Sequence, residues 1–511
     1  NGVSALMIAA SLNNPLCAQL LLSEMNLQTN LGQTALIFAC TQSNYQVVEI
    51  LKQEQAIFDN NKKTALMYAA QAGSLICCEF VKSLLGLVDI NNNSALILTI
   101  EQLIEYDQKV PQQVIQNYHQ VIQFLLPHEK KLFKTDHSSI LHLFAKANLP
   151  FSSQLVDQLR LKNELGQTAL MLAAKYNNNS IISQLTSELG IKDNTGKCAL
   201  HYAAQTGNLK ITDFLYQYES DIVDSQLNNC LHYAAQGNNS ELCQNMKHLW
   251  AKKRNCFGEP PFFNAVRNYQ QANSIVLQET AQDVDYHGNT ALIIAAEVDN
   301  ADVVKLLLKQ IGKTNKNGAT ASMICGQYGS IKIFKFLVEN EKQTPEKNIL
   351  FEAVKFNQYK LVKLILDLSR GESSIIDQNS IYDIKIQAIC EKMLSFTKKN
   401  ESPLCQAIFA GSDECIQLLS FQKPEANDLT PLMKAVQREG ISTKSIIKLA
   451  NIYAGRQIGL EKGYQKGISA LMIACMQTFD NSDIIQILCE FEADIKDSQN
   501  KTWKDYAIAA G

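Results

Sequence analysis

The chain has 511 residues, of which 46% are apolar and 19% charged, and its formal net charge is −3 from 47 basic and 50 acidic residues. The apolar share excludes a largely disordered chain, and the near balance of charge argues against a nucleic-acid binder that acts through a broad positive field. No run of about 18 apolar residues without charge occurs, so no membrane-spanning helix is expected. Amides are frequent, with 41 Asn and 43 Gln.

A short motif recurs through nearly the whole chain. GVSALMIAA begins at Gly2, GQTALIFAC at Gly32, KKTALMYAA at Lys62 and NNSALILTI at Asn92, so that the first four copies follow one another at the same step. Fixed spacing together with a shared motif indicates a repeat protein. Marked by the Ala of the motif or the residue in its place, the sixteen copies lie at Ala5, Ala35, Ala65, Ala95, Ile140, Ala169, Ala199, Cys230, Pro261, Ala291, Ala321, Ile349, Pro403, Pro431, Ala470 and Trp503.

Each copy is predicted to form two short helices. A Gly and then a Ser or Thr, as in Gly32 and Thr34, predict a turn and the cap of a first helix with small apolar residues on one face. A second apolar helix is expected to follow, for example over 47–51 and over 303–308. Two such helices cannot bury their own faces, so neighbouring copies must stack. The residues predicted to end the first helix in a left-handed conformation are Gly73, Gly207, Gly329, Gly411, Asn13, Asn177, Asn238 and Asn357.

This pattern resembles the ankyrin repeat, whose motif is Gly-x-Thr-Pro-Leu-His-x-Ala-Ala followed by Gly and a Leu-rich helix. Three copies keep the family's His, at His142, His201 and His232, and the resemblance implies that these side chains hydrogen-bond backbone between neighbouring repeats. It also implies an all-α solenoid of about sixteen helix-turn-helix units in a right-hand-curved stack. The copies are shorter than the usual ankyrin period of about 33 residues, which predicts shorter loops. The TALM-x-AA style is similar to the protein 21.1 group of diplomonad protists.

Three steps between markers exceed the common period, from Ala95 to Ile140, from Ile349 to Pro403 and from Pro431 to Ala470. Insertions in solenoids usually fall in loops between repeats, so structural variation is the first interpretation and a projecting docking element is the alternative. The predicted organisation is ankyrin repeats over 1–98, a helical insertion over 99–137, ankyrin repeats over 138–368, an insertion over 369–401, and degenerate repeats with a final half-repeat over 402–511.

The sequence lacks the motifs of the common enzyme classes. No GxxxxGK[ST], GxGxxG, HExxH or GxSxG occurs. The 14 cysteines are scattered, without a CxxC pair or zinc-ligand spacing. Several, such as Cys40 and Cys198, take the place of Ala, and we interpret them as small buried residues in a reducing compartment. We therefore expect no catalytic site, no cofactor and no metal.

A stack of this kind is predicted to bind other proteins along its concave side, where the turn tips and first helices lie. In the ankyrin family the residues beside the turn Gly, and the two residues after the Ala-Ala step, are free of packing and make contacts. At the turns the resemblance assigns this role to Gln33, Lys63, Gln167, Lys197 and Asn289. At the ends of the first helices it assigns the role to Gln42, Gln71, Lys175, Tyr176, Gln205, Gln236, Gln327, Tyr328, Lys355, Phe356, Gln437 and Arg438.

Three aromatic residues stand out in that set. Aromatic side chains are favoured as binding anchors, and the core does not require Tyr176, Tyr328 and Phe356. The alternative is that they are ordinary single exposed apolar residues. The aromatics one step before the Ala-Ala pair are instead interpreted as core: Phe38, Tyr68, Tyr202 and Tyr233.

The leading hypothesis is a non-enzymatic scaffold for protein partners, located in the cytoplasm and associated with cytoskeletal or signalling proteins as similar families are. Asn1 lies inside a copy, so further chain is expected upstream. One alternative is therefore the substrate-targeting region of a kinase whose catalytic domain precedes Asn1. Another is the cytosolic repeat region of a membrane channel, for which the sequence gives no support.

Overall fold

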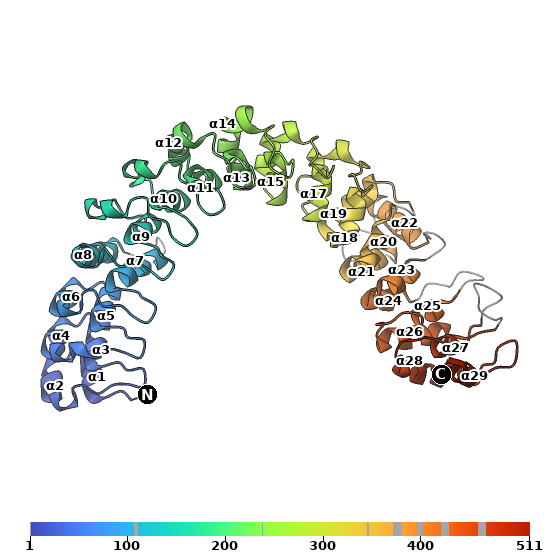
Figure 1. The fold of residues 1–511 in the computed structure, drawn as a ribbon, viewed down its shortest axis with the longest axis horizontal. Coiled ribbons are helices and arrows are strands. Elements are labelled where there is room, and N and C mark those ends of the chain that lie inside the picture. The colour runs from blue at the N-terminus through green and yellow to red at the C-terminus, as the bar shows by residue number, and fades with distance from the viewer. Residues whose placement is uncertain are drawn as a thin grey trace. The chain divides into compact units, whose positions relative to one another are not determined.

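The computed structural model describes residues 2–106, 111–237, 239–344, 347–370, 381–395, 402–420, 429–457 and 467–510. Over these residues the structure is helical, with one isolated β-bridge between Val284 and Thr290 and no β-strand. The predicted all-α class is confirmed. The chain divides into an N-terminal block, 1–256, and a C-terminal block, 257–511, and in each block helix pairs follow one another side by side (Figure 1).

Every one of the sixteen markers is the first residue of a helix. The cap is the preceding residue, as at Thr64, whose hydroxyl accepts from the backbone N–H of Met67 at 3.2 Å. In the N-terminal block these first helices are α1 (Ala5–Ser11), α3 (Ala35–Thr41), α5 (Ala65–Gln71), α7 (Ala95–Glu105), α9 (Ile140–Lys146), α10 (Ala169–Lys175), α11 (Ala199–Thr206) and α13 (Cys230–Gln236). In the C-terminal block they are α15 (Pro261–Arg267), α17 (Ala291–Glu297), α18 (Ala321–Tyr328), α20 (Ile349–Lys355), α23 (Pro403–Ala410), α25 (Pro431–Ala435), α27 (Ala470–Cys475) and α29 (Trp503–Ala510).

The predicted helix ends are confirmed wherever the structure describes them. Their φ angles run from 53° at Asn13 to 82° at Gly207, which is the left-handed region. Asn238 lies outside the described residues. In that repeat the preceding Gly237 has an extended backbone, with φ −81° and ψ 174°.

The second segment of each repeat varies more than the first. In the N-terminal block it is formed by α2 (Pro15–Leu20), α4 (Tyr45–Leu51), α6 (Leu75–Phe80), α8 (Gln112–Glu129), α12 (Leu209–Glu219) and α14 (Ser240–Trp250). In the C-terminal block it is formed by α16 (Gln271–Val276), α19 (Ile331–Asn340), α21 (Tyr359–Ser369), α24 (Asp413–Leu419), α26 (Thr443–Tyr453) and α28 (Ser482–Glu492). Short 3-10 turns follow or replace these helices at η1 (Leu22–Glu24), η2 (Lys52–Ala56), η3 (Lys82–Leu84), η4 (Ser153–Gln158), η5 (Ile182–Gln184), η6 (Thr186–Glu188), η7 (Gln278–Thr280), η8 (Val304–Leu306) and η9 (Leu308–Gln310).

The second apolar helix predicted over 303–308 is present as the 3-10 helices η8 and η9 and not as an α-helix. The presence of 3-10 turns follows the length of chain between two bonded residues of the repeat, although α4 precedes η2 where Leu36 and Glu54 are bonded at the same separation as in this repeat. The backbone N–H of Leu292, near the start of α17, donates to Gln310, which lies 18 residues later. In the repeat of α12, whose second helix is continuous, the N–H of Leu200 donates to Glu219, which lies 19 residues later. A 3-10 helix rises about 2.0 Å per residue against 1.5 Å for an α-helix, so the shorter segment spans the same distance by tightening its backbone.

The residues predicted as insertions form helices that pack on the stack. In 99–137, α7 continues to Glu105 and α8 takes the place of a second helix, packed against α6 and α7. In 369–401 the structure describes α22 (Ile381–Ser395), which packs on α19 and α21 with Ile386, Cys390 and Met393 buried. None of the described helices combines the length and the apolar character that crossing a membrane requires.

Candidate interaction surface

Neighbouring repeats are joined by a buried polar side chain near the end of the second segment. In the second repeat this is Glu54, whose two carboxylate oxygens accept from the backbone N–H of Asn26 at 2.7 Å and of Leu36 at 2.8 Å. Asn26 belongs to the preceding repeat and Leu36 to the same repeat, so one carboxylate fixes both. We call this site the bridging position. It is occupied in the same way by Glu129, Glu188, Glu219, Glu341 and Glu492.

Gln replaces Glu at the bridging position when the preceding repeat offers a carbonyl instead of an N–H. Gln158 accepts from Leu141 and donates to the carbonyl of Lys130, and Gln310 accepts from Leu292 and donates to the carbonyl of Ala281. Lys130 and Ala281 have right-handed helical backbone. The residues of the preceding repeat that donate to Glu are left-handed, and they are Asn26, Gly86, Arg160, Gly190, Gly312 and Gly455. The side chain thus matches the orientation of the preceding peptide.

A second bridge between neighbouring repeats uses a side-chain amide near the start of the second segment. Asn178 is buried and its Nδ2 donates to the carbonyls of Phe144, Ala145 and Leu149 at 3.2, 3.4 and 3.0 Å, all in the preceding repeat. These carbonyls lie in and just after the last turn of α9, where a helix leaves its carbonyls without partners of its own. The same role is played by Asn44, Asn239, Asn300 and Gln358. Both bridges hold the first helices in register, and so they fix the surface that the helix ends form.

The turns are built around an Asp that is not among the predicted contact residues. Asp193 accepts from the N–H groups of Thr195 and Lys197 through Oδ1, and from the hydroxyl of Tyr202 through Oδ2 at 2.6 Å. Burial acts to raise the pKa of Asp193, but the hydrogen bonds led by Tyr202 outweigh it and the pKa is lowered. The same arrangement recurs at Asp59, Asp224 and Asp497. An Asp nine positions before a Tyr is the signal that could have revealed it.

The residues predicted to make contacts fall into three groups by exposure. Gln167 is buried, because its amide donates to the Tyr202 hydroxyl of the next repeat at 2.8 Å. It is therefore not accessible to a partner. Exposed are Gln42, Lys175, Tyr176, Tyr328, Lys355 and Phe356. Half-buried are Gln33, Lys63, Gln71, Lys197, Gln205, Gln236, Asn289, Gln327, Gln437 and Arg438.

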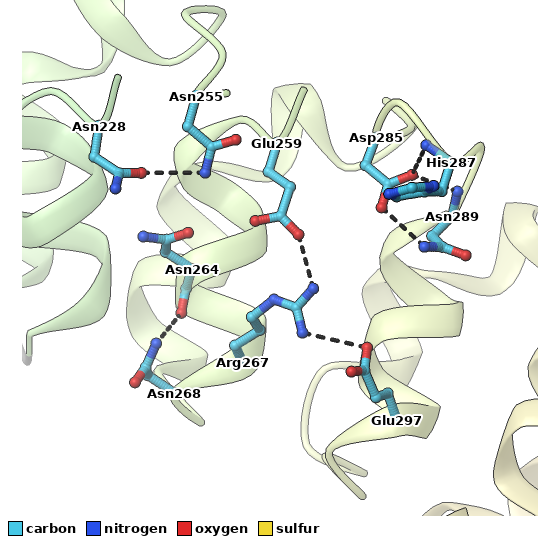
Figure 2. A network of polar contacts seen from close by, with 10 residues as sticks. All are labelled: Asn228, Asn255, Glu259, Asn264, Arg267, Asn268, Asp285, His287, Asn289 and Glu297. Carbon is cyan, nitrogen blue, oxygen red and sulfur yellow. Dashed lines mark hydrogen bonds and ion pairs between the residues drawn. The ribbon is translucent and has the colours of Figure 1, made fainter. Parts of the chain in front are cut away.

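Several half-buried members of that set already bond within the stack. Gln33 donates to the hydroxyl of Tyr68 at 3.3 Å, and Lys63 reaches Oε1 of Gln71 at 3.5 Å within its own repeat. Asn289 donates to Asp285 at 2.9 Å, as Figure 2 shows. Contacts with a partner at these positions would compete with bonds that the repeats already make. Of the four aromatics interpreted as core, Tyr202 and Tyr233 are buried, whereas Phe38 and Tyr68 are half-buried.

The three motif histidines share one contact, in which Nδ1 accepts from the backbone N–H of the residue that caps the first helix. His142 accepts from the N–H of Ser139 through Nδ1 and meets the carbonyl of Gln167, in the next repeat, at 2.9 Å through Nε2. The inter-repeat bond that the resemblance implied is therefore present at His142. His201 accepts from the N–H of Cys198 at 3.0 Å, which requires a neutral ring with Nδ1 unprotonated.

Acid is expected to weaken the repeats around α11 through His201. Burial lowers its pKa from 6.5 to about 4, so the folded chain holds the ring neutral while the unfolded chain protonates it. Above pH 6.5 the ring is neutral in both states and the free energy of unfolding is unaffected. As the pH falls toward 4, protonation of the unfolded chain lowers the free energy of unfolding by on the order of 3 kcal/mol. Urea unfolding at about pH 7.5 and about pH 4.5 should show a smaller loss for His201→Met, since Met occupies this position in several other repeats.

Comparing the variant with the parent chain cancels the contributions of titrating groups that both proteins contain. Burial raises the pKa of Glu188 and of Glu219, so these carboxyls favour the folded state as the pH falls, the opposite sense to His201. Both are present in the parent chain and in the variant. Equal acid sensitivity of the two proteins would contradict the assignment to His201.

A family model for ankyrin repeats, in three copies, matches residues 6–98, 111–226, 173–248, 231–314 and 300–379. The chain belongs to the ankyrin-repeat family. The matched ankyrin repeats begin within α1 and end at residue 379, and the helices from α22 to α29 lie beyond them. No curated protein matches the chain. Ankyrin repeats are generally protein-protein interaction modules. The exposed residues at the turns and at the ends of the first helices are therefore the place to look for a partner.

Proposed function

We propose that this chain is a non-enzymatic scaffold that binds partner proteins through the turn tips and the ends of the first helices. The observation that carries the proposal is the exposure of aromatic side chains where first helices end. Tyr176, Tyr328 and Phe356 are 40%, 51% and 42% exposed, although the bridges and the core need none of them. Exposed aromatic side chains of this kind are the usual anchors of a protein interface.

The location and kinship of the scaffold are part of the same proposal. We place it in the cytoplasm with cytoskeletal or signalling partners, supported by 14 cysteines that are all free thiols and mostly buried. Kinship with the protein 21.1 group of diplomonad ankyrin proteins is supported by the TALM-x-AA motif at Ala65 and Ala169.

Replacing Tyr176, Tyr328 and Phe356 together by Ala should weaken partner binding at least about tenfold, because anchor residues contribute most of the energy of an interface. The measurement is the capture of a saturable partner by the full chain, followed by titration of the purified pair. Helical content, measured by circular dichroism, should remain unchanged. A matched control replaces Tyr218 and Tyr359, which are similarly exposed but lie on the second helices α12 and α21. Unaltered affinity of the triple variant would remove these aromatics from the surface.

A further inference from the structure

Two lysines and a tyrosine meet where α9 and α10 end. Lys146 is the last residue of α9, Lys175 is the last residue of α10, and Tyr176 follows it. The Nζ atoms of Lys146 and Lys175 lie 5.8 and 5.6 Å from the centroid of the Tyr176 ring. All three side chains are exposed. We call this group the lysine–tyrosine cluster.

No carboxylate neutralises these two lysines within the described part of the chain. Neither Nζ has an ion pair within 4.0 Å, and neither donates a hydrogen bond to another side chain there. The acidic residues of the two adjacent turns are engaged elsewhere. Asp136 accepts from the N–H of Ser138, and Glu164 lies 3.4 Å from His137.

Charged residues at the same place in other repeats do have partners. Arg267, the last residue of α15, bonds Glu259 at 2.7 Å and Glu297 at 3.2 Å, and Figure 2 shows it between the two carboxylates. Lys355, the last residue of α20, lies 3.9 Å from Glu352. The recurring solution at this position is thus a cation matched by a carboxylate. The lysine–tyrosine cluster has the cations and lacks the anion.

The physical consequence is a preference for a bound carboxylate. Two ammonium groups near one ring repel each other, and an anion beside them replaces repulsion by attraction. The exposed part of Tyr176 offers an apolar surface beside that place. Lysines act as point charges, so the two ammonium groups set the sign of the ligand charge and not its shape. The apolar ring beside them favours a peptide segment in which acidic and apolar side chains are neighbours, and the comparison with a phosphorylated peptide tests this choice.

We propose that the lysine–tyrosine cluster binds an acidic, extended segment of a partner protein. One carboxylate of the segment lies between Lys146 and Lys175, and a neighbouring apolar side chain packs on Tyr176. The inference rests on the proposed scaffold function and specifies the chemistry of the partner for one part of the surface.

The test uses the full chain and a fluorescent peptide, Glu-Glu-Leu-Glu-Glu, followed by anisotropy at low and at physiological salt. Lys146→Gln with Lys175→Gln should weaken binding at least tenfold, and raising the salt should weaken the parent complex. The matched control is Lys210→Gln, an exposed lysine on α12, which should bind within twofold of the parent. The neutral peptide Gln-Gln-Leu-Gln-Gln should not bind. Equal binding of the two peptides, no loss in the double variant, or tighter binding of a peptide carrying phosphoserines in place of glutamates would overturn the proposal.

A partner captured by the full chain separates this inference from the scaffold function. If that partner binds the double lysine variant normally and loses affinity for the Tyr328→Ala, Phe356→Ala variant, the acidic-segment inference fails and the scaffold stands. If none of these variants changes its affinity, both fail. Loss of affinity in the double lysine variant alone supports the acidic segment.

Discussion

Replacing Glu54 by Gln should destabilise the N-terminal block by about 2–3 kcal/mol, although the two side chains have almost the same shape. Both oxygens of Glu54 accept backbone N–H groups, from Asn26 and from Leu36, and the site is buried. A Gln can accept only one of them, and its NH2 group would face the other donor. Urea unfolding should show the loss, and hydrogen exchange should become faster at the amides of Asn26 and Leu36.

The first repeat provides a matched control for this change. Glu24 occupies the bridging position there and accepts from the N–H of Leu6 at 2.8 Å, but the described residues supply no preceding N–H to its second oxygen. Glu24→Gln should therefore leave stability within about 0.5 kcal/mol of the parent. If Glu24→Gln and Glu54→Gln cost the same, the bridging function assigned to Glu54 is wrong.

Asn178→Asp should be at least as damaging. The Nδ2 group of Asn178 donates to three carbonyls, and a carboxylate in its place would set an acceptor against acceptors in a fully buried site. The loss of the bonds and the repulsion together should cost on the order of 3–4 kcal/mol. The measurement is again urea unfolding, together with hydrogen exchange over α9 and α10.

The same substitution one residue later tests the geometry. Asn179 is exposed, and among the described residues its side-chain amide bonds only the nearby carbonyl of Asn177, at 3.4 Å. Asn179→Asp introduces the same charge into the same loop and should change stability by less than about 0.5 kcal/mol. Comparable losses in the two variants would mean that added charge, and not the bridge, is responsible.

The first helices could be predicted from the sequence because their signals are local. The cap at Thr64, the small apolar face after it and the left-handed Gly73 all lie within one short stretch, so each copy carries its own evidence. The second segments could not be predicted as well. The repeat of Glu54 and the repeat of Gln310 have the same length of chain between their bonded residues, yet the first keeps α4 before η2 and the second has η8 and η9 alone, so no local apolar pattern decides how much of the segment is α-helical.

The candidate site was predicted only in part for a similar reason. Exposure of Tyr176 and Phe356 follows from their place after the first helix, and the structure agrees. Gln167 has an equally typical place at a turn, yet it is buried because the hydroxyl of Tyr202, 35 residues later, reaches it. Burial of that kind depends on pairs of repeats. The bridging position could not be predicted from the motif, because its residue changes between Glu and Gln with the backbone of the preceding repeat.

That dependence has an evolutionary consequence. A repeat carrying Gln158 needs a carbonyl from the repeat before it, whereas one carrying Glu219 needs an N–H, here from left-handed Gly190. Suppose that recombination placed a repeat carrying Gln158 directly after the repeat that contains Gly190. The NH2 group of the Gln and the N–H of the Gly would then meet as two donors in a buried site. Duplication and shuffling of repeats are therefore expected to succeed only between compatible neighbours. The order of repeats along this chain is therefore constrained by the backbone at each junction, beyond the sequence of any single copy.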